Sequence, residues 1–360
     1  MGARINGAVR KGLRLKLQGV RITRCGSPAG SSCRQRNLMK VHLALIGEEA
    51  YDDVFHIEEF EKLHAKADER LHELVSDPAA ADLILFVGYR YDTFYQDLAA
   101  CEIFRHHGAK CFIYDPKPFP RVVLPGVYTS SWKWHEMPSP HRSYCLVERR
   151  DDYPINQYVQ YRPPEAERRL FCSYVGSNTH PVRKKLLTLD FGRQDVILRD
   201  TTGKYVHSDF GGDQTASKKE YAELCNQSRF MLCPSGVAPN SIRMYEALKS
   251  GCVPVVIADM WNAPKGPDWD QCVLWVGENE THRIPEILGN VSAERWTEMA
   301  KAGHAAFNEY FAPDRQFNRV IWLLQDIGMA AAADCARAKG RPRYSKLIHR
   351  VRAKLHGPCP

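Results

Sequence analysis

The sequence lacks several patterns that each mark a class of protein. No window approaches about 18 consecutive apolar residues, the length that a membrane-spanning helix needs, and residues 1–37 are basic without the apolar core of a signal peptide. No G-x-G-x-x-G motif follows an apolar run, which counts against a dinucleotide-binding dehydrogenase. The twelve cysteines include no C-x-x-C pair and no zinc-type cluster with histidine. We therefore expect a cytoplasmic protein with reduced thiols and no metal site.

Acidic residues are absent from both ends of the chain. Residues 1–47 contain ten lysines and arginines and residues 337–360 contain eight, without an aspartate or glutamate in either segment. Because the formal net charge is +8, the residues between them carry a net charge of −10. The basic ends predict peripheral contact with an anionic membrane, and apolar residues four apart within 346–356 favour an interfacial helix over a nucleic-acid arm. The alternative is a pair of solvated tails, and no specific nucleic-acid partner is expected.

The length and composition fit a globular protein of two domains. The chain has 360 residues, of which 44% are hydrophobic and 26% charged, and a domain usually holds about 100–200 residues. The apolar and charged patterns divide the chain into four parts. These are a basic N-terminal extension (1–39), an N-terminal domain (40–150), a C-terminal domain (151–335) and a basic C-terminal tail (336–360).

The N-terminal domain alternates apolar runs with amphipathic segments. The expected elements are strands at 41–47, 82–88 and 110–115, helices at 56–75 and 93–107, and a further strand at 143–147. This β-α-β-α-β order predicts a parallel, doubly wound sheet. Before the last strand lies a proline- and aromatic-rich stretch, 116–140. Its Trp132, Trp134 and His135 are either a stacking surface for a sugar or part of a packed connection.

The C-terminal domain contains the most informative stretch, residues 228–258. The sequence there predicts a strand, a loop, a helix and a second strand, which together make a βαβ unit. Asn240 and Ser241 are good N-cap residues, and Gly251 stands where a left-handed C-cap residue is needed. The continuous apolar run at 253–257 is typical of a parallel strand covered on both faces. The other expected elements are strands at 170–176, 196–199 and 273–276, and helices at 181–189, 218–227, 292–310 and 313–328.

The start of the helix in this βαβ unit is a candidate phosphate site. Orphan N–H groups and the positive end of the helix dipole attract phosphate there, and Arg243 on the first turn adds a bidentate donor. Glu246 lies three residues further on and projects from the same face. The pair therefore suits a sugar nucleotide, with the diphosphate on Arg243 and the ribose hydroxyls on Glu246. The alternative, equally compatible with the spacing, is an ion pair on a solvated helix face.

The segment 240–256, NSIRMYEALKSGCVPVV, resembles the signature of the exostosin-like glycosyltransferases. The matching residues are Cys233, Pro234, Gly236, Asn240, Ser241, Arg243, Glu246, Ala247, Gly251, Cys252, Pro254, Val255 and Val256, with Tyr174, Val175, Gly176, Arg183, Leu186 and Tyr221 upstream. The resemblance covers about residues 171–264. Asn240 and Ser235 depart from the family pattern, which more often has an aspartate and a basic residue at these positions.

The resemblance implies a GT-B fold, an α/β architecture in which two Rossmann-like, doubly wound domains face each other across a cleft. It also implies inverting transfer of a sugar from a nucleotide-sugar to a carbohydrate or glycoconjugate acceptor, without an essential metal. We expect a UDP-linked donor and no further cofactor. Arg183 would reach phosphate or acceptor, the alternative being a surface arginine. The donor-binding residues would be Gly236, Asn240, Ser241, Arg243, Glu246 and Arg183.

An inverting transferase needs a base that takes the proton of the acceptor hydroxyl. Glu48, Asp92 and Asp115 follow the first three strands of the N-terminal domain and are the candidate catalytic residues. The sequence does not decide between them, and for each the alternative is a charge on a surface loop.

Two other functions fit the same residues. One is a fucosyltransferase-like GT-B enzyme that uses a GDP-sugar, although the Thr-Glu-Lys signature of those enzymes is absent. The other is a non-catalytic protein of the same fold that binds carbohydrate or polyanions. Donor hydrolysis would separate an enzyme from a binder. DNA binding that falls steeply with salt and survives the loss of Glu246 would favour a polyanion-binding protein.

Overall fold

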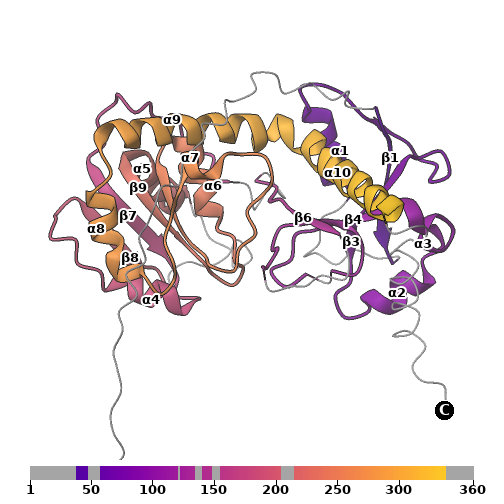
Figure 1. Ribbon diagram of the computed structural model, residues 1–360, viewed down its shortest axis with the longest axis horizontal. Coiled ribbons are helices and arrows are strands. Elements are labelled where there is room, and N and C mark those ends of the chain that lie inside the picture. Colours follow the sequence, from indigo (N-terminus) through magenta and orange to yellow (C-terminus); the bar gives the residue numbers. More distant parts are fainter. Residues whose placement is uncertain are drawn as a thin grey trace, which may run out of the picture. The chain divides into compact units, whose positions relative to one another are not determined.

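The computed structural model describes residues 38–47, 57–120, 122–133, 140–147, 155–203 and 215–337. They belong to one compact unit, residues 37–360, and form two parallel β-sheets covered by helices (Figure 1). This α/β architecture with two Rossmann-like sheets confirms the predicted GT-B fold class. The cleft and the boundaries of the two domains stay predictions. The two basic ends fall mostly outside the described residues, so the predicted membrane contact also stays a prediction.

The first sheet comes from the N-terminal part of the chain. In the described residues its strand order is β2-β1-β3-β4-β5-β6, with every pair parallel. Helix α1 covers one face with Phe60 and Leu63, and α2 covers the other with Phe94 and Leu98. The elements are β1 (Lys40–Ile46), α1 (Ile57–Lys66), β2 (Glu73–Leu74), β3 (Leu83–Tyr89), α2 (Phe94–Ala100), α3 (Glu102–His107), β4 (Cys111–Asp115), β5 (Gly126–Tyr128) and β6 (His141–Ser143).

The second sheet has the strand order β8-β7-β9-β10-β11 in the described residues and is also parallel. Helices α4 and α8 cover one face through Leu186 and Leu288, and α5 and α6 cover the other through Cys225 and Tyr245. The elements are β7 (Leu170–Gly176), α4 (Pro181–Leu187), β8 (Val196–Asp200), α5 (Thr215–Gln227), β9 (Ser228–Pro234), α6 (Ile242–Ser250), β10 (Val253–Ile257), α7 (Trp269–Cys272), β11 (Leu274–Trp275), α8 (Ile284–Gly289), α9 (Ala293–Tyr310) and α10 (Gln316–Arg337).

Both helices predicted for the N-terminal domain differ from the structure. The helix expected at 56–75 ends at Lys66 and is followed by the short edge strand β2. The helix expected at 93–107 is divided by Cys101, whose backbone is extended with φ −62° and ψ 110°. In both cases the amphipathic pattern continues past the point where the hydrogen-bonded helix ends, so periodicity alone overestimates the length.

The strand expected at 143–147 is also wrong, because β6 lies at 141–143. Two of the backbone N–H groups beyond it bind side chains instead of a neighbouring strand. The N–H of Leu146 donates to the hydroxyl of Tyr114, and that of Val147 donates to Oε1 of Gln316. These bonds replace the ladder of a sheet.

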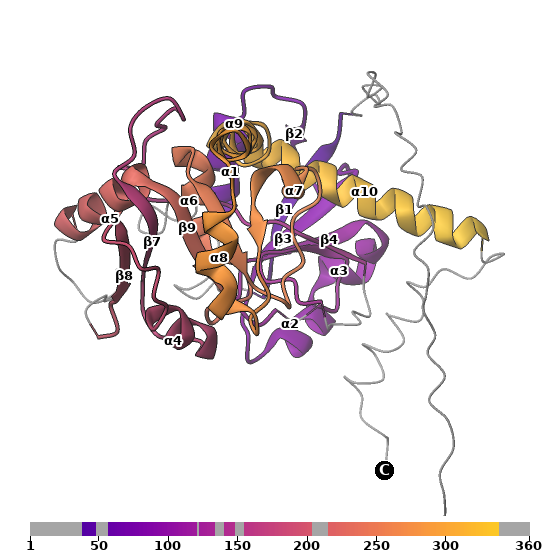
Figure 2. The ribbon, with the colours of Figure 1, turned by 60° about the vertical axis from the view of Figure 1, so that its left-hand side comes forward.

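Helix α10 follows the second sheet in the sequence but packs against the first. It contacts α1, β5 and β6, and Figures 1 and 2 show it on the side of the first sheet. Its buried Phe317, Val320 and Leu324 belong to the same hydrophobic cluster as Phe60 of α1. Helix α10 is therefore part of the core around the first sheet.

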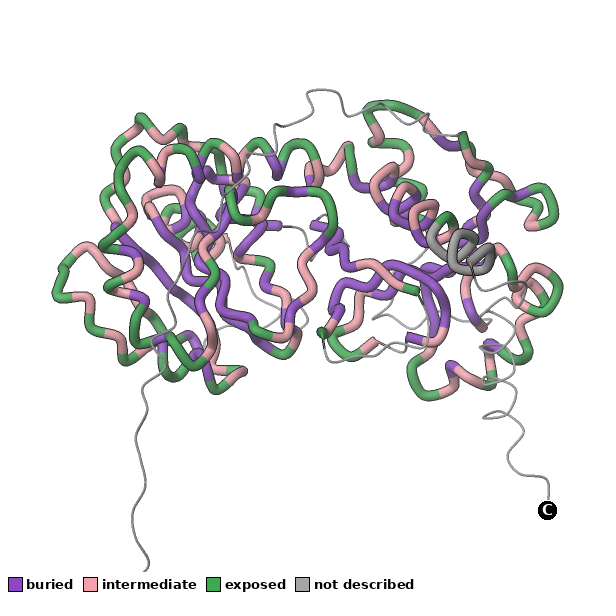
Figure 3. Tube along the Cα trace, in the orientation of Figure 1, coloured by how far each residue is buried: buried purple, intermediate pink, exposed green. Residues whose placement is uncertain are grey.

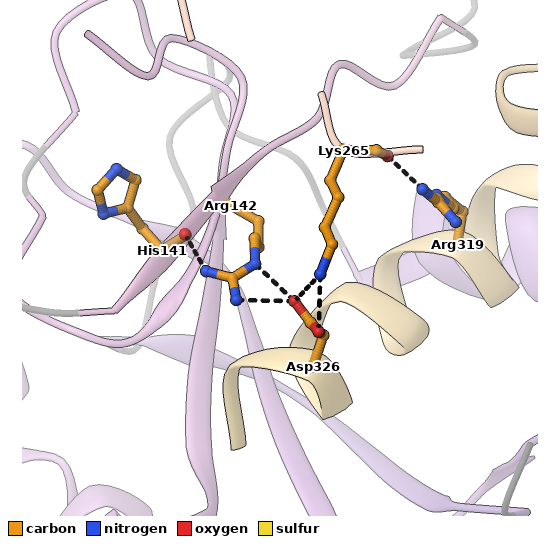
Figure 4. Close-up of polar contacts among 5 residues, drawn as sticks. All are labelled: His141, Arg142, Lys265, Arg319 and Asp326. Atoms are coloured by element: carbon orange, nitrogen blue, oxygen red, sulfur yellow. Dashed lines mark hydrogen bonds and ion pairs between the residues drawn. The ribbon is translucent and has the colours of Figure 1, made fainter. Parts of the chain in front are cut away.

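Asp326 on α10 binds two cations from different parts of the chain (Figure 4). Its Oδ2 accepts a hydrogen bond from Nε of Arg142 in β6 at 2.7 Å, and both of its carboxylate oxygens accept from Nζ of Lys265 at 3.0 Å. Lys265 lies in the segment that follows β10, and its carbonyl accepts from Arg319 of α10. These contacts tie α10 both to the first sheet and to a loop of the second.

The strands of both sheets are buried, whereas the loops around them are mostly exposed (Figure 3). The eight cysteines for which the structure gives a state are free thiols. No helix within the described ranges is long and apolar enough to cross a membrane. The same ranges hold no group of three or more histidine, cysteine, aspartate or glutamate side chains arranged to bind a metal.

Candidate functional site

The loops that leave β7 and β9 meet at one edge of the second sheet. In the second sheet β7 lies between β8 and β9. The chain runs from β7 to β8 on one side and then crosses over β7 to β9 on the other. The boundary between β7 and β9 is therefore a topological switch point, the place at which α/β sheets bind ligands. Strand β7 ends at Gly176, β9 ends at Pro234, and α6 begins at Ile242 after the loop that follows β9. The fold thus brings the two predicted donor-binding segments together.

Arg243 lies on the first turn of α6 and reaches across to the end of β7. Its Nε donates to the carbonyl of Val175 at 2.8 Å, and its guanidinium carbon lies 5.5 Å from the ring centre of Tyr174. A Cβ atom on Gly176 would clash with Nη2 of Arg243. Glycine at this position therefore permits the close approach of the guanidinium to the strand end.

Arg183 lies on the first turn of α4 and is only 8% exposed, so it is not the surface arginine that was the alternative. Its Nε donates to the carbonyl of Ser235 and its Nη1 donates to that of Ser177, both at 2.8 Å. A Cβ atom on Gly236 would clash with its Nη2. Burial lowers the pKa of Arg183, and the positive charge of Arg243 lowers it further.

Arg183 and Arg243 together form a positive site at the switch point. In the described part of the chain neither makes an ion pair with a carboxylate, and the hydrogen bonds described above go to backbone carbonyl oxygens. Ser241 is the N-cap residue of α6, but its Oγ is buried without a hydrogen-bond partner and does not cap the helix as expected. An anion at this point would meet two guanidinium groups, a free hydroxyl and the orphan N–H groups of a helix.

Glu246 is buried on the second turn of α6 and has two partners inside the protein. Its Oε1 accepts from the backbone N–H of Asn156 at 3.0 Å, and its Oε2 accepts from the hydroxyl of Tyr221 at 2.7 Å. Burial raises its pKa, and the hydrogen bond from Tyr221 opposes that rise. Glu246 is 5% exposed and forms no ion pair with Arg243, so the solvated ion pair is wrong. Its ribose-binding role stays a prediction.

The candidate bases differ sharply in exposure. Glu48 lies outside the described residues. The side chain of Asp92 is 72% exposed and forms an ion pair with Arg90 at 3.5 Å. Asp115 is fully buried and accepts from the hydroxyl of Tyr89 at 2.7 Å. Asp92 and Asp115 lie at the carboxyl ends of neighbouring strands, β3 and β4, but only Asp92 is open to solvent.

Contacts between the loop after β5 and loops of the second sheet were not predicted. Oγ of Ser130 donates to Oδ1 of Asn240 at 3.4 Å, and Trp132 forms an antiparallel bridge with Trp261. The partners are separated by more than a hundred residues and lie in segments without periodic patterns, so no local signal pointed to these pairs. Trp134 and His135 lie outside the described residues.

The family model of the Exostosin GT47 domain matches residues 127–291. This part of the chain is therefore similar to the exostosin-like glycosyltransferases. Arg183, Arg243 and Glu246 lie within the matched residues, whereas Asp92 and Asp115 lie before them.

Curated relatives of this exostosin-like domain cover a limited part of the chain. The match to the Exostosin-1 homolog of Caenorhabditis elegans is 39% identical over 93 residues, which are 25% of this chain and 24% of that protein. Exostosin-1 of Drosophila melanogaster is 32% identical over 166 residues, which are 38% of this chain and 22% of that protein. The chain thus spans about a quarter of the length of the curated relatives it matches.

Solved structures resemble the chain over a larger share of its length but at lower sequence identity. An α1,3-fucosyltransferase is 13% identical, with a TM-score of 0.39 over 83% of this chain and 92% of that one. The HepE protein of Anabaena in complex with UDP-glucose is 10% identical, with a TM-score of 0.36 over 82% of this chain and 100% of that one.

Proposed function

We propose that the protein is a glycosyltransferase that moves a sugar from a nucleotide-sugar, UDP-linked, to a hydroxyl of a carbohydrate or glycoconjugate. The observation that carries the proposal is the pairing of Arg183 and Arg243, without carboxylate partners, at the switch point of the second sheet. The exostosin-like domain that contains both residues supports it. A diphosphate is the ligand that this arrangement suits best, because charge-assisted bonds from guanidinium groups are strong and can be bidentate.

The donor diphosphate lies between the two arginines and over the start of α6 in this proposal. Both guanidinium groups donate hydrogen bonds to backbone carbonyls and pack closely against glycines, which fixes their positions. They therefore need little reorganisation when negative charge develops on the leaving diphosphate. Ser241 supplies its unpartnered hydroxyl as a further hydrogen-bond donor. We expect these groups, without a metal ion, to stabilise the leaving group during direct displacement with inversion.

The acceptor hydroxyl loses its proton to a carboxylate at the carboxyl edge of the first sheet. Of the two described candidates, Asp92 is the one that solvent and therefore an acceptor can reach, whereas Asp115 is fully buried. Geometry comes before pKa in the choice of a general base. We therefore place the base at Asp92, with Arg90 as its ion-pair partner.

Calorimetric titration of the full-length protein with UDP, GDP and CMP tests the donor site. We expect UDP to bind wild type, and Arg243→Ala and Arg183→Ala each to weaken that binding about 10–100-fold, the loss of one charge-assisted contact. The matched control is Arg193→Ala, which removes an exposed arginine that pairs with Asp195 at the opposite end of the same sheet. Absence of nucleotide binding to wild type, or equal binding by all variants, would contradict the proposal.

A further inference from the structure

A stacked aromatic pair lies beside the first sheet and has no part in the site formed by Arg183, Arg243 and Ser241, here called the arginine site. The rings of Phe119 and Trp132 are 6.2 Å apart between centroids and are tilted by 12°. Phe119 is 56% exposed, although a large aromatic side chain usually gains by burial. We propose that this pair, here called the aromatic platform, is the surface on which a sugar ring of the acceptor stacks. The inference rests on the proposed function and names where its acceptor binds.

The aromatic platform is held in place by its surroundings. Phe119 lies between Pro118 and Pro120, whose rings fix their backbone φ angles. Nε1 of Trp132 donates to the carbonyl of Pro118 at 3.3 Å, which locks the indole to the loop that carries Phe119. A surface that is rigid before binding loses little conformational entropy when a ligand arrives. An exposed aromatic that is fixed in this way suits recognition.

The loop that carries Trp132 also binds the segments that follow β9 and β10. The N–H of Lys133 donates to the carbonyl of Met260 at 2.8 Å, and Oγ of Ser130 donates to Oδ1 of Asn240 at 3.4 Å. Asn240 directly precedes Ser241 of the arginine site. The aromatic platform is thus connected through Ser130 of its own loop to the start of α6, over which we place the donor, and through Lys133 to the segment after β10.

The chemistry of this edge favours a carbohydrate. A pyranose ring offers an apolar face of C–H groups, which packs on an aromatic ring, and a rim of hydroxyls, which needs polar partners. Phe119 follows β4, and the neighbouring strand β3 is followed by the exposed Asp92, paired with Arg90, and by the exposed Tyr91. Carboxylate and guanidinium groups accept from and donate to hydroxyls. A ring stacked on Phe119 would therefore lie at the same sheet edge as the proposed base.

The test compares sugar binding with nucleotide binding in the same full-length protein. The probes are cellotriose, xylotriose and chitotriose, measured by saturation-transfer NMR and calorimetry, with UDP titrated in parallel. We expect at least one trisaccharide to bind wild type. Phe119→Ser should weaken that binding about tenfold, and Phe119→Tyr, which keeps an aromatic ring, should restore it to within about threefold of wild type. UDP should bind all variants equally.

The matched control is Tyr161→Ser. Tyr161 is 43% exposed and stacks on His304 at 3.6 Å, so it is an exposed, stacked aromatic away from the sheet edge. We expect it to leave trisaccharide binding unchanged. The platform is contradicted if wild type and Phe119→Ser bind every trisaccharide with equal affinity, or if no trisaccharide binds at all. UDP binding by wild type would in that case still support the donor site. The proposed function itself is contradicted by a different result, namely that wild type does not bind UDP.

Discussion

Tyr221 donates its hydroxyl proton to Oε2 of Glu246 at 2.7 Å, and this contact lies inside the protein. A carboxylate that is buried in this way is expensive to ionise, so burial raises the pKa of Glu246 above its ordinary value of 4.5. The folded protein then keeps a proton on Glu246 at a pH where the unfolded chain has lost it. The free energy of unfolding therefore falls, through this group, as pH rises above 4.5.

This shift predicts the pH dependence of Glu246→Gln. Glutamine keeps the shape of the protonated acid but does not ionise, so the destabilisation of the variant relative to wild type should shrink between about pH 4 and about pH 7. Urea unfolding of both proteins at several pH values in this range measures the difference. A destabilisation that grows with pH would mean that the carboxylate, and not the acid, is the stabilised form.

Gly176→Ala should disturb the donor site more than the fold. A Cβ atom there would clash with Nη2 of Arg243, so the guanidinium must move away from the strand end. We expect UDP affinity to fall about tenfold, with a loss of about 1–3 kcal/mol in the free energy of unfolding. Gly289→Ala is the control, since nothing lies within 4 Å of its added Cβ. Unchanged UDP binding by Gly176→Ala would show that the position of Arg243 is unimportant for the nucleotide.

Arg168 should be a major source of stability without a role in binding. Its guanidinium donates to the carbonyls of Asn226, Ser228, Arg162 and Ser250. Asn226 and Ser250 lie in the last turns of α5 and α6, where a cation is favourable. Arg168→Ala should lower the free energy of unfolding by about 2–4 kcal/mol. The neighbouring, exposed Arg169→Ala should change it by less than about 0.5 kcal/mol. Similar losses in both variants would refute this role.

Asp326→Asn should weaken the attachment of α10 in a pH-dependent manner. Burial alone would raise the pKa of Asp326, but the bonds from Lys265 and Arg142 outweigh it and lower the pKa below its ordinary 3.8. The stabilisation from this carboxylate is therefore present above pH 3.8 and is lost as pH falls through the lower, folded-state pKa. Because Lys265 is half exposed, the loss at neutral pH should be only about 1–2 kcal/mol.

Denaturant unfolding at about pH 7 and about pH 3, in low and high salt, measures the contribution of Asp326. Asp195→Asn is the control, because it removes the exposed partner of Arg193 without touching α10. An Asp326→Asn penalty that is independent of pH would assign the effect to packing instead of charge.

Local patterns predicted the βαβ unit at the switch point well. The apolar runs of β9 and β10 and the helix between them appear within one residue of the expected bounds, and Gly251 has the left-handed φ of 73° that its C-cap position requires. Short-range propensity determines such features. The interior position of Glu246 could not be predicted in this way, because it depends on Asn156 and Tyr221 from distant parts of the chain.

Local patterns did not predict the structure of the aromatic and proline-rich segment before β6. Strand β5 is only Gly126–Tyr128 and has no alternating pattern, so it was missed, although all of its residues are buried. Ser130 and Trp132 likewise gain their partners from the segments around Asn240 and Trp261. These contacts form only when both sheets are folded, so no local sequence pattern predicts them.

The position of α10 sets the order in which the protein can be completed. Phe317, Val320 and Leu324, which fill the core beside α1, are among the last described residues to leave a ribosome. The first sheet therefore keeps an open apolar face until both sheets and α10 have been synthesised. A fragment that stops before residue 316 would expose that face permanently and should aggregate, whereas one that includes α10 can close it.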